Sequence, residues 1–416
     1  MAGRRSRIAF AGALVTGALL TGVAPAVATV APATTAPPAT GKLFAPLTCG
    51  SPPAPAREVT DVPWPQRRYA PDRLSALATG AGIIVAVIDS GVDADHPQLT
   101  GRVVEGTDYL DPGGDGGLDC AGHGTAVASI IAATPHRGVG FRGLAPKAKI
   151  LPVRISEQQI IDGKESGRTV TAAQFARAIR WAVDHDADVL NLSVVLYKDD
   201  HLVRAAIGYA VERDVVVVAA AGNLHENGDP RPYPAAYEGV LGVGAIGADG
   251  IRSAFSQAGP YVDVVAPGGE VLAATTGRGH KWQNGTSYAT PFVSATAALV
   301  REYRPDLSAR EVIARIIATA DPAPGGARSD AYGSGVLNPY RAVTDTKAAG
   351  AAPPPVVLPD EPADPVTIAA AERRSHSREA SLELAALGGG TAGVALLLAV
   401  VLPRGARRRW RPADPA

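Results

Sequence analysis

The chain has 416 residues, and its 40 lysine and arginine residues balance its 40 aspartate and glutamate residues. Because this balance creates no overall electrostatic field, it argues against a nucleic acid as the main partner. A composition that is 46% apolar is sufficient for the core of one catalytic-size α/β domain with appendages.

Residues 1–28 have the features of an export signal. A basic start is followed by the apolar run 8–20 and by the small-residue triplet Ala26-Val27-Ala28. The alternative is an ordinary buried N-terminal helix, which Pro25 disfavours because proline breaks a packed helix. We therefore predict cleavage after Ala28 and export of the remaining chain.

The chain contains two cysteines, Cys49 and Cys120. In the oxidising environment that export implies, they most simply form one disulfide bond, whereas in the cytosol they would be two unrelated buried thiols. We predict the disulfide.

The next segments differ sharply in composition. Residues 29–71 are rich in alanine, proline and threonine, and we expect an extended arm that lies on the following domain. Over residues 72–343, apolar runs alternate with segments of helical periodicity, which is typical of βαβ units. The predicted fold is a layered α/β sandwich with a mostly parallel central sheet.

Several predicted strands end at polar residues. The apolar run 83–88 stops at Asp89, and a second buried strand, 215–219, leads to Asn223. Because ligands bind at the carboxyl ends of strands in such sheets, we expect a functional site near these two residues. Further strands are predicted at 188–192, 240–246 and 262–265, and helices at 175–183, 201–213 and 292–301.

The C-terminal part suggests a membrane anchor. Residues 344–383 form a proline-rich stalk, and residues 384–402 are uncharged and, as a helix, span about 28 Å, close to the thickness of a bilayer core. The tail 403–416 is rich in arginine, which places it in the cytoplasm and the preceding domain outside. The alternative is a disordered tail rich in alanine and glycine.

Three short motifs carry the components of acyl transfer, which needs a nucleophile, a base and a carboxylate that orients the base. Asp89 follows a buried strand, His123 begins an apolar helical stretch, and Ser287 lies in the first turn of another helix, where negative charge is favoured. Taken singly, each has a structural alternative: a hydrogen-bonded buried carboxylate, a core histidine and a helix N-cap.

Together, these motifs resemble the subtilisin family over residues 72–343, in the family's Asp, His, Ser chain order. The resemblance implies that Ser287 is the nucleophile, His123 the general base and Asp89 the residue that orients it. The segment 219–223 matches the family's oxyanion motif and assigns Asn223 to the oxyanion hole. The implied activity is that of a serine endopeptidase.

The layout also resembles the mycosins, membrane-anchored subtilases linked to type VII secretion. This implies a polypeptide substrate, a membrane location with an extracytoplasmic domain, and association with a secretion complex. Where many secreted subtilisins have a glycine-rich substrate edge, this chain has 194–196, Val-Val-Leu, which favours restricted specificity. The alternatives are a non-catalytic scaffold subunit and a general surface protease.

No cofactor or metal is predicted. A glycine-rich loop contains four aspartates that are candidate calcium ligands: Asp108, Asp111, Asp115 and Asp119. Their spacing differs from the EF-hand pattern, so we prefer an interpretation as a solvated loop.

Overall fold

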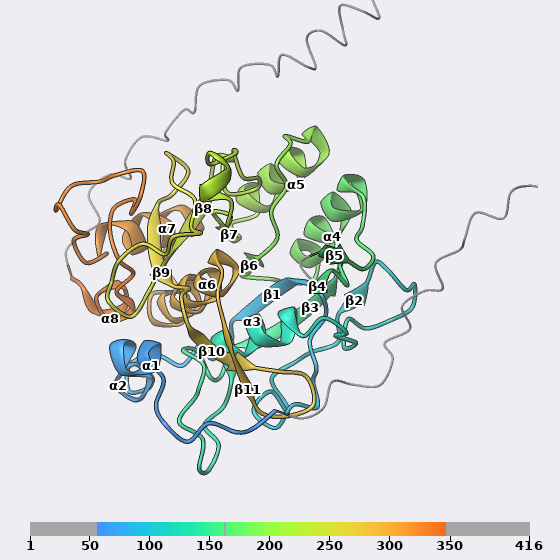
Figure 1. Ribbon diagram of the computed structural model, residues 1–416, viewed down its shortest axis with the longest axis horizontal. Coiled ribbons are helices and arrows are strands. Elements are labelled where there is room, and N and C mark those ends of the chain that lie inside the picture. Colours follow the sequence, from blue (N-terminus) through green and yellow to red (C-terminus); the bar gives the residue numbers. More distant parts are fainter. Residues whose placement is uncertain (1–55, 162–163, 347–416) are drawn as a thin grey trace, which may run out of the picture. The chain divides into compact units, whose positions relative to one another are not determined.

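The computed structural model describes residues 56–161 and 164–346. Its main sheet has the strand order β2-β3-β1-β6-β7-β8-β9, and every neighbouring pair is parallel (Figure 1). The strands are β1 Ile84–Asp89, β2 Thr107–Asp108, β3 Lys149–Arg154, β6 Val189–Leu192, β7 Val216–Ala220, β8 Val240–Ile246 and β9 Val264–Pro267. The predicted α/β fold with a mostly parallel sheet is confirmed.

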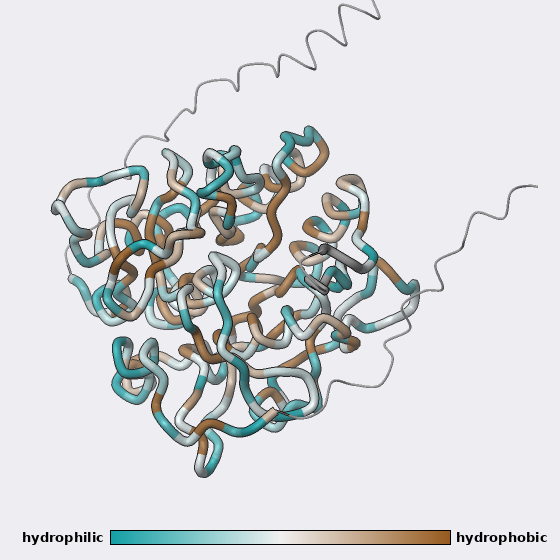
Figure 2. Tube along the Cα trace, in the orientation of Figure 1, coloured by the Kyte–Doolittle hydropathy of each residue, from teal (hydrophilic) through white to brown (hydrophobic). Residues whose placement is uncertain are grey.

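The central strands are apolar throughout because both faces of the sheet are buried. In β1, Val85 and Val87 belong to the hydrophobic cluster on one face, while Ala86 and Ile88 belong to the cluster on the other. This alternation is the two-residue period of a strand. Along the chain, hydrophobic segments gather on the inner strands and helices, and hydrophilic segments lie in the outer loops (Figure 2).

Helices cover both faces of the sheet. The first cluster includes residues of α3 and α6, and the second includes residues of α4 and α5, which pack side by side. These helices are α3 His123–Ala132, α4 Ala172–Asp184, α5 His201–Glu212 and α6 Thr286–Tyr303. The helix α4 begins with a capping box, in which the side chains of Thr171 and Gln174 each accept a backbone N–H at the helix start.

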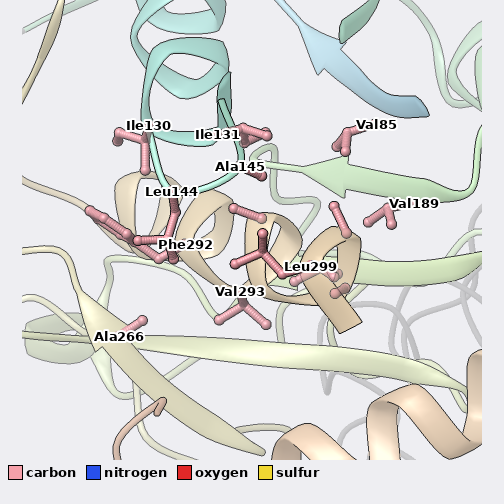
Figure 3. Close-up of a cluster of buried hydrophobic side chains, with 14 of the residues drawn as sticks. Val85, Ile130, Ile131, Leu144, Ala145, Val189, Ala266, Phe292, Val293 and Leu299 are labelled. Carbon is pink, nitrogen blue, oxygen red and sulfur yellow. The ribbon is translucent and has the colours of Figure 1, made fainter. Parts of the chain in front are cut away.

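The core beneath the first face holds α3 and α6 in place. Figure 3 shows Ile130 and Ile131 of α3, Phe292 and Leu299 of α6 and Val85 of β1 within one cluster of buried side chains. Because the predicted site residues His123 and Ser287 lie in the first turns of α3 and α6, this core fixes the positions of their side chains.

Shorter elements complete the described part of the chain. The hairpins β10–β11 and β4–β5 lie outside the main sheet, and α7 and α8 both pack against α6. Their bounds are β4 Gln159–Ile161, β5 Lys164–Ser166, β10 Val271–Ala274, β11 His280–Gln283, α7 Ala309–Ala318, α8 Pro339–Thr344 and a 3₁₀ turn at His225–Asn227.

The described part of the arm differs from the extended segment that we predicted. Two short helices, α1 (Trp64–Tyr69) and α2 (Pro71–Ser75), occupy its end and continue into the domain. Proline is favoured at the first turn of a helix because its φ angle is already set and no N–H is needed there, which accounts for both helix starts. The ring of Tyr69 packs against Phe292, with ring centroids 5.6 Å apart.

The arm is also bonded to the domain before α1. The Ala56 N–H donates to the Arg278 carbonyl over 2.9 Å, and the Gly140 N–H donates to the Val59 carbonyl over 3.0 Å. At the start of α1, the indole N–H of Trp64 donates to the Glu270 carbonyl over 2.9 Å.

The predicted signal peptide 1–28, the membrane segment 384–402 and the tail 403–416 lie outside the described residues. Within residues 56–161 and 164–346, no helix is long and apolar enough to span a membrane.

Candidate active site

Asp89 is the last residue of β1, and its carboxylate is buried at the carboxyl end of the sheet. Its Oδ1 accepts the Ser90 N–H over 2.7 Å and lies 2.7 Å from Nδ1 of His123. The first bond holds the carboxylate relative to its own backbone, so the second fixes the tautomer of His123 with a proton on Nδ1.

His123 is the first residue of α3, and its Nε2 lies 3.0 Å from Oγ of Ser287. The next residue, Gly124, allows the helix to approach β1, because a Cβ there would lie 2.1 Å from the Gly91 carbonyl oxygen. The imidazole side chain is 28% exposed, so one edge remains accessible to a substrate. Its ring also lies against that of Tyr288, with centroids 5.2 Å apart.

Ser287 is the second residue of α6, and the hydroxyl of Ser193 donates to its carbonyl over 2.9 Å. The helix begins after Gly285, whose φ of 153° is a conformation that side-chain-bearing residues rarely adopt. The start of α6 also carries the positive end of the helix dipole, which favours a negative charge beside Ser287.

Asn223 follows β7 and is oriented by Thr286. Its Oδ1 accepts both the backbone N–H and the hydroxyl of Thr286, each over 2.9 Å. A Cβ on Gly285 would lie 3.0 Å from Oγ of Ser287 and 3.4 Å from Nδ2 of Asn223. The amide N–H group and the serine hydroxyl therefore border the same small space, which glycine leaves open.

The electrostatics of His123 follow from these contacts. Burial opposes the charged imidazolium, but the Asp89 carboxylate beside Nδ1, with a further contribution from Asp119, raises the pKa of His123 above its usual value. A base whose protonated form is stabilised in this way is suited to accepting a proton from a neighbouring hydroxyl.

The structure thus brings together all four residues that sequence reasoning assigned to the site. The arrangement has the components of nucleophilic acyl transfer: a hydroxyl, a base within hydrogen-bonding distance and an oriented carboxylate. Sequence reasoning missed Thr286, Tyr288 and Ser90 as partners of these residues. For Thr286 and Tyr288 the signal was their position on either side of Ser287, but only the folded contacts reveal what each one touches.

The four loop aspartates do not gather around a common point. Asp108 and Asp111 both contact Arg154, at 2.5 and 2.9 Å, and hydrogen bonds from Arg168 and Arg154 hold the pKa of Asp111 well below its usual range. Asp115 accepts the Gly117 N–H, and Asp119 is buried behind His123. Among residues 56–161 and 164–346, no group of three or more His, Cys, Asp or Glu side chains is arranged to hold a metal ion.

The predicted disulfide involves Cys120, three residues before His123, and Cys49. Because Cys49 lies outside the described residues, this bond stays a prediction.

The model of the subtilase family, Peptidase_S8, matches residues 80–335. This match covers more than half of the chain and contains all four site residues. The chain therefore belongs to the subtilase family of serine peptidases.

Within this family, the chain is similar to the mycosins. It is 37% identical to Mycosin-1 of Mycobacterium tuberculosis, over 78% of this chain and 84% of that protein. It is also 38% identical to a thermophilic serine proteinase of Bacillus sp. strain AK1, over 67% of this chain and 66% of that protein.

The chain is also similar to solved structures of mycosins. The crystal structure of MycP1 from the ESX-1 type VII secretion system matches with a TM-score of 0.62 and 32% identity, over 72% of this chain and 90% of that one. The MycP3 protease from the ESX-3 system matches with a TM-score of 0.58 and 33% identity, over 74% of this chain and 99% of that one.

Proposed function

We propose that this chain is a membrane-anchored, extracytoplasmic serine endopeptidase of restricted specificity that hydrolyses peptide bonds with Asp89, His123 and Ser287. The observation that carries the proposal is the continuous contact from Asp89 through His123 to Ser287, at 2.7 and 3.0 Å. These distances allow proton transfer from the hydroxyl to the imidazole as the nucleophile attacks.

In the acylation step, Oγ of Ser287 attacks the scissile carbonyl carbon while Nε2 of His123 takes its proton. The imidazolium that forms is stabilised by Asp89, whose carboxylate remains ionised. The C–N bond then breaks, and His123 returns the proton to the leaving amine. In the second step, water attacks the acyl-enzyme with His123 again acting as base, which releases the acid and restores the hydroxyl of Ser287.

The negative charge that develops on the carbonyl oxygen needs preorganised donors. Two groups supply them: the side-chain N–H of Asn223 and the backbone N–H of Ser287 at the start of α6. The support for this assignment is the bond pair from Thr286, which occupies Oδ1 of Asn223 and so leaves its Nδ2 for the substrate.

The proposed restriction of specificity rests on the segment after β6. Its Leu196 exchanges two backbone hydrogen bonds with Tyr233, at 2.7 and 2.8 Å, so this part of the edge is already paired. A substrate strand that adds to the sheet here has only the neighbouring Val194 and Val195 available, and both carry β-branched side chains that limit the room.

The catalytic proposal is tested by purifying the wild-type protein and the Ser287→Ala variant and measuring hydrolysis of a peptide library. We expect Ser287→Ala to fold normally and to lose cleavage by several orders of magnitude, because the nucleophile is absent. The matched control is Ser329→Ala, which removes the hydroxyl of an exposed serine and should cleave as the wild type does. Full cleavage by Ser287→Ala would contradict the proposal.

We further propose that the enzyme faces outward from the membrane, anchored by residues 384–402, and that it processes substrates of a type VII secretion system. The support is the similarity to MycP1 and MycP3, whose structures are described as parts of such systems, together with the apolar segment and basic tail. In intact protoplasts, added protease should degrade the domain, whereas an epitope placed after Trp410 should be protected. An exposed epitope would contradict this orientation.

The same similarity favours a second role as a stabilising subunit of the secretion complex. The two roles separate when a deletion strain is complemented with Ser287→Ala. Restored secretion without substrate processing indicates a structural role, whereas failure of the variant to restore secretion indicates that proteolysis itself is required.

A further inference from the structure

Asp119 is a buried carboxylate, 7% exposed, in the loop that leads into α3 and the catalytic histidine. It has no part in the acyl-transfer steps. Its surroundings also exclude the calcium-binding role considered from the sequence, because both of its oxygens are occupied by hydrogen-bond donors of the protein.

Four donors converge on this carboxylate. Oδ1 accepts the Ser90 hydroxyl over 2.8 Å and the Gly122 N–H over 2.7 Å. Oδ2 accepts the N–H and the hydroxyl of Thr125, over 2.8 and 2.6 Å. Two bonds at each oxygen match the capacity of an ionised carboxylate.

A neutral acid or an amide does not satisfy the same set. Either one introduces a donor at a position that already faces a donor. The hydroxyls of Ser90 and Thr125 cannot readily become acceptors for such a donor, because each oxygen already accepts a backbone N–H. Oγ of Ser90 accepts the Gly124 N–H over 2.8 Å, and Oγ1 of Thr125 accepts the Asp93 N–H over 3.0 Å. Loss of the negative charge therefore leaves at least one of the four donors without an acceptor, so the hydrogen-bond network has to rearrange.

The network connects the two segments that carry Asp89 and His123. Ser90 donates its N–H to Oδ1 of Asp89, the same oxygen that faces His123, and its hydroxyl bridges Asp119 to the N–H of Gly124. Asp119 thus bonds to the residue after Asp89 on one side and to the first turn of α3 on the other. The helix α3 packs directly beside β1 (Figure 1).

We propose that Asp119 is a positioning residue that, as an ionised carboxylate acting through Ser90 and Thr125, holds Asp89 and His123 at hydrogen-bonding distance. This inference rests on the proposed function of those two residues. Its consequence is that productive geometry depends on the ionisation of a group that never touches the substrate.

The charge state of Asp119 adds a pH dependence. Burial raises the pKa of Asp119 to about 6, although its four hydrogen bonds oppose the rise. The titratable and charged groups around it are Asp89 on β1, Asp93 after it, His123 on α3 and Tyr288 on α6, with Arg154 and Glu157 beside the adjacent Cys120. As the pH falls, Asp119 takes up a proton, as does His123, whose pKa lies above its usual value, and protonation of either group should lower activity.

The test compares Asp119→Asn with wild type in kcat, KM and the pH profile of kcat/KM for a peptide that the wild type cleaves. We expect kcat to fall about 10- to 100-fold, as for a small misplacement of catalytic groups, with KM changed less than about 2-fold. The midpoint of the acid limb should move to lower pH, because the removed negative charge no longer favours protonated His123.

The matched control is Asp263→Asn. Asp263 is also a largely buried carboxyl whose pKa is raised to about 6 by burial, but it precedes β9, at the opposite end of the sheet from the site. This variant can change thermal stability, yet it should leave the acid-limb midpoint where it is in the wild type. A purely structural role for Asp119 would make the two variants behave alike.

If Asp119→Asn does not fold, as judged by near-ultraviolet circular dichroism, Ser90→Ala decides the question, because it keeps the carboxylate and removes only the bridge. A loss of kcat in Ser90→Ala supports the proposal, and an unchanged kcat contradicts it. Asp119→Asn with wild-type kcat and pH profile would also overturn it. A wild-type protein that cleaves no peptide would instead contradict the proposed function, so the two failures are distinguishable.

Discussion

Thr286 donates both its backbone N–H and its hydroxyl to Oδ1 of Asn223, each over 2.9 Å. The same hydroxyl accepts the Gly222 N–H over 3.1 Å, so it also fixes the turn that precedes Asn223. The residue before the proposed nucleophile therefore sets the direction of the side chain that is proposed to bind the oxyanion.

The first prediction follows from this pair. Asn223→Ala should lower kcat by about 10²–10³, the loss reported for the equivalent change in subtilisin, because one oxyanion donor is removed. Thr286→Val should produce a smaller loss, since the N–H of Thr286 still contacts Oδ1. Thr286→Ser retains the hydroxyl and serves as the control. Steady-state kinetics on one peptide check all three, and wild-type kcat in Asn223→Ala would rule out its role.

The second prediction concerns Arg154, whose side chain is fully buried and contacts Asp108, Asp111 and Glu157. Arg154→Ala should lower the free energy of unfolding by about 3–5 kcal/mol, because the buried Asp108 carboxylate loses its counter-charge, whereas Glu157 and Asp111 keep Arg168. In contrast, Arg304→Ala disrupts an exposed pair with Asp306 and should leave the free energy of unfolding close to the wild-type value. Urea denaturation measures both, and equal effects would contradict the account.

The third prediction is a pH dependence of stability. Burial, with repulsion from His96 and His136, lowers the pKa of His280 to about 4. The unfolded chain, with a histidine pKa of about 6.5, then binds more protons than the folded chain between these values. The stabilising contribution is complete above about pH 6.5 and is lost as the pH falls toward 4.

Asp119 and Asp263 change the stability in the opposite direction over the same pH range. Their pKa values are raised in the folded state, so they favour the folded state as the pH falls. The prediction therefore compares how the melting temperatures of a variant and of the wild type respond to pH. Lowering the pH from 7 to 5 should reduce the melting temperature of His280→Gln less than that of wild type, or raise it more, whereas the exposed-site control His201→Gln should respond as wild type does. An unchanged pH response in His280→Gln would contradict the assignment.

The fourth prediction is that the N-terminal arm is a permanent brace and not a removable inhibitory prodomain. Residues 29–71 are too few and too rich in proline to build a separate core, and their described part is bonded to the domain through Ala56, Val59 and Trp64. A Cys49–Cys120 disulfide closes 71 steps of chain, since 120 − 49 = 71, which corresponds to about 4.4 kcal/mol in the chain-entropy model.

Cys49→Ser should therefore lower the melting temperature without any gain in activity. Differential scanning calorimetry and peptide hydrolysis on the same preparation measure the two quantities. Activation of a previously inactive enzyme when a protease removes the arm would show instead that the arm is a prodomain.

Much of the fold could be predicted because its central strands are buried on both faces and therefore apolar throughout. The predicted strand 240–246 coincides with β8, β6 begins one residue later than predicted, and β1 and β7 are each shifted by one residue along the chain. The strand β3 was missed because Pro152 lies inside it, and a proline argues against a central strand. The helix α1 was missed because its proline-rich surroundings are typical of extended chain.

The site residues were predictable for a different reason: each lies in a motif that the family shares. The contacts that support these residues could not be predicted, because they join residues far apart in the sequence. Asp119 was considered from the sequence as a candidate metal ligand, and only the fold reveals that Ser90, 29 residues away, donates to it. The ion pairs of Arg154 with Asp108 and Asp111 similarly depend on the pairing of β2 with β3.

The measurement that tests the central claim most directly is the mapping of a fluorophosphonate adduct. The account predicts that the probe labels the wild-type protein on Ser287, that peptide mass spectrometry finds the adduct on the tryptic fragment containing this residue, and that His123→Ala, which lacks the base, reacts far more slowly. An adduct on another serine, or labelling of Ser287→Ala at the wild-type rate, would contradict the claim that Asp89, His123 and Ser287 form the catalytic centre.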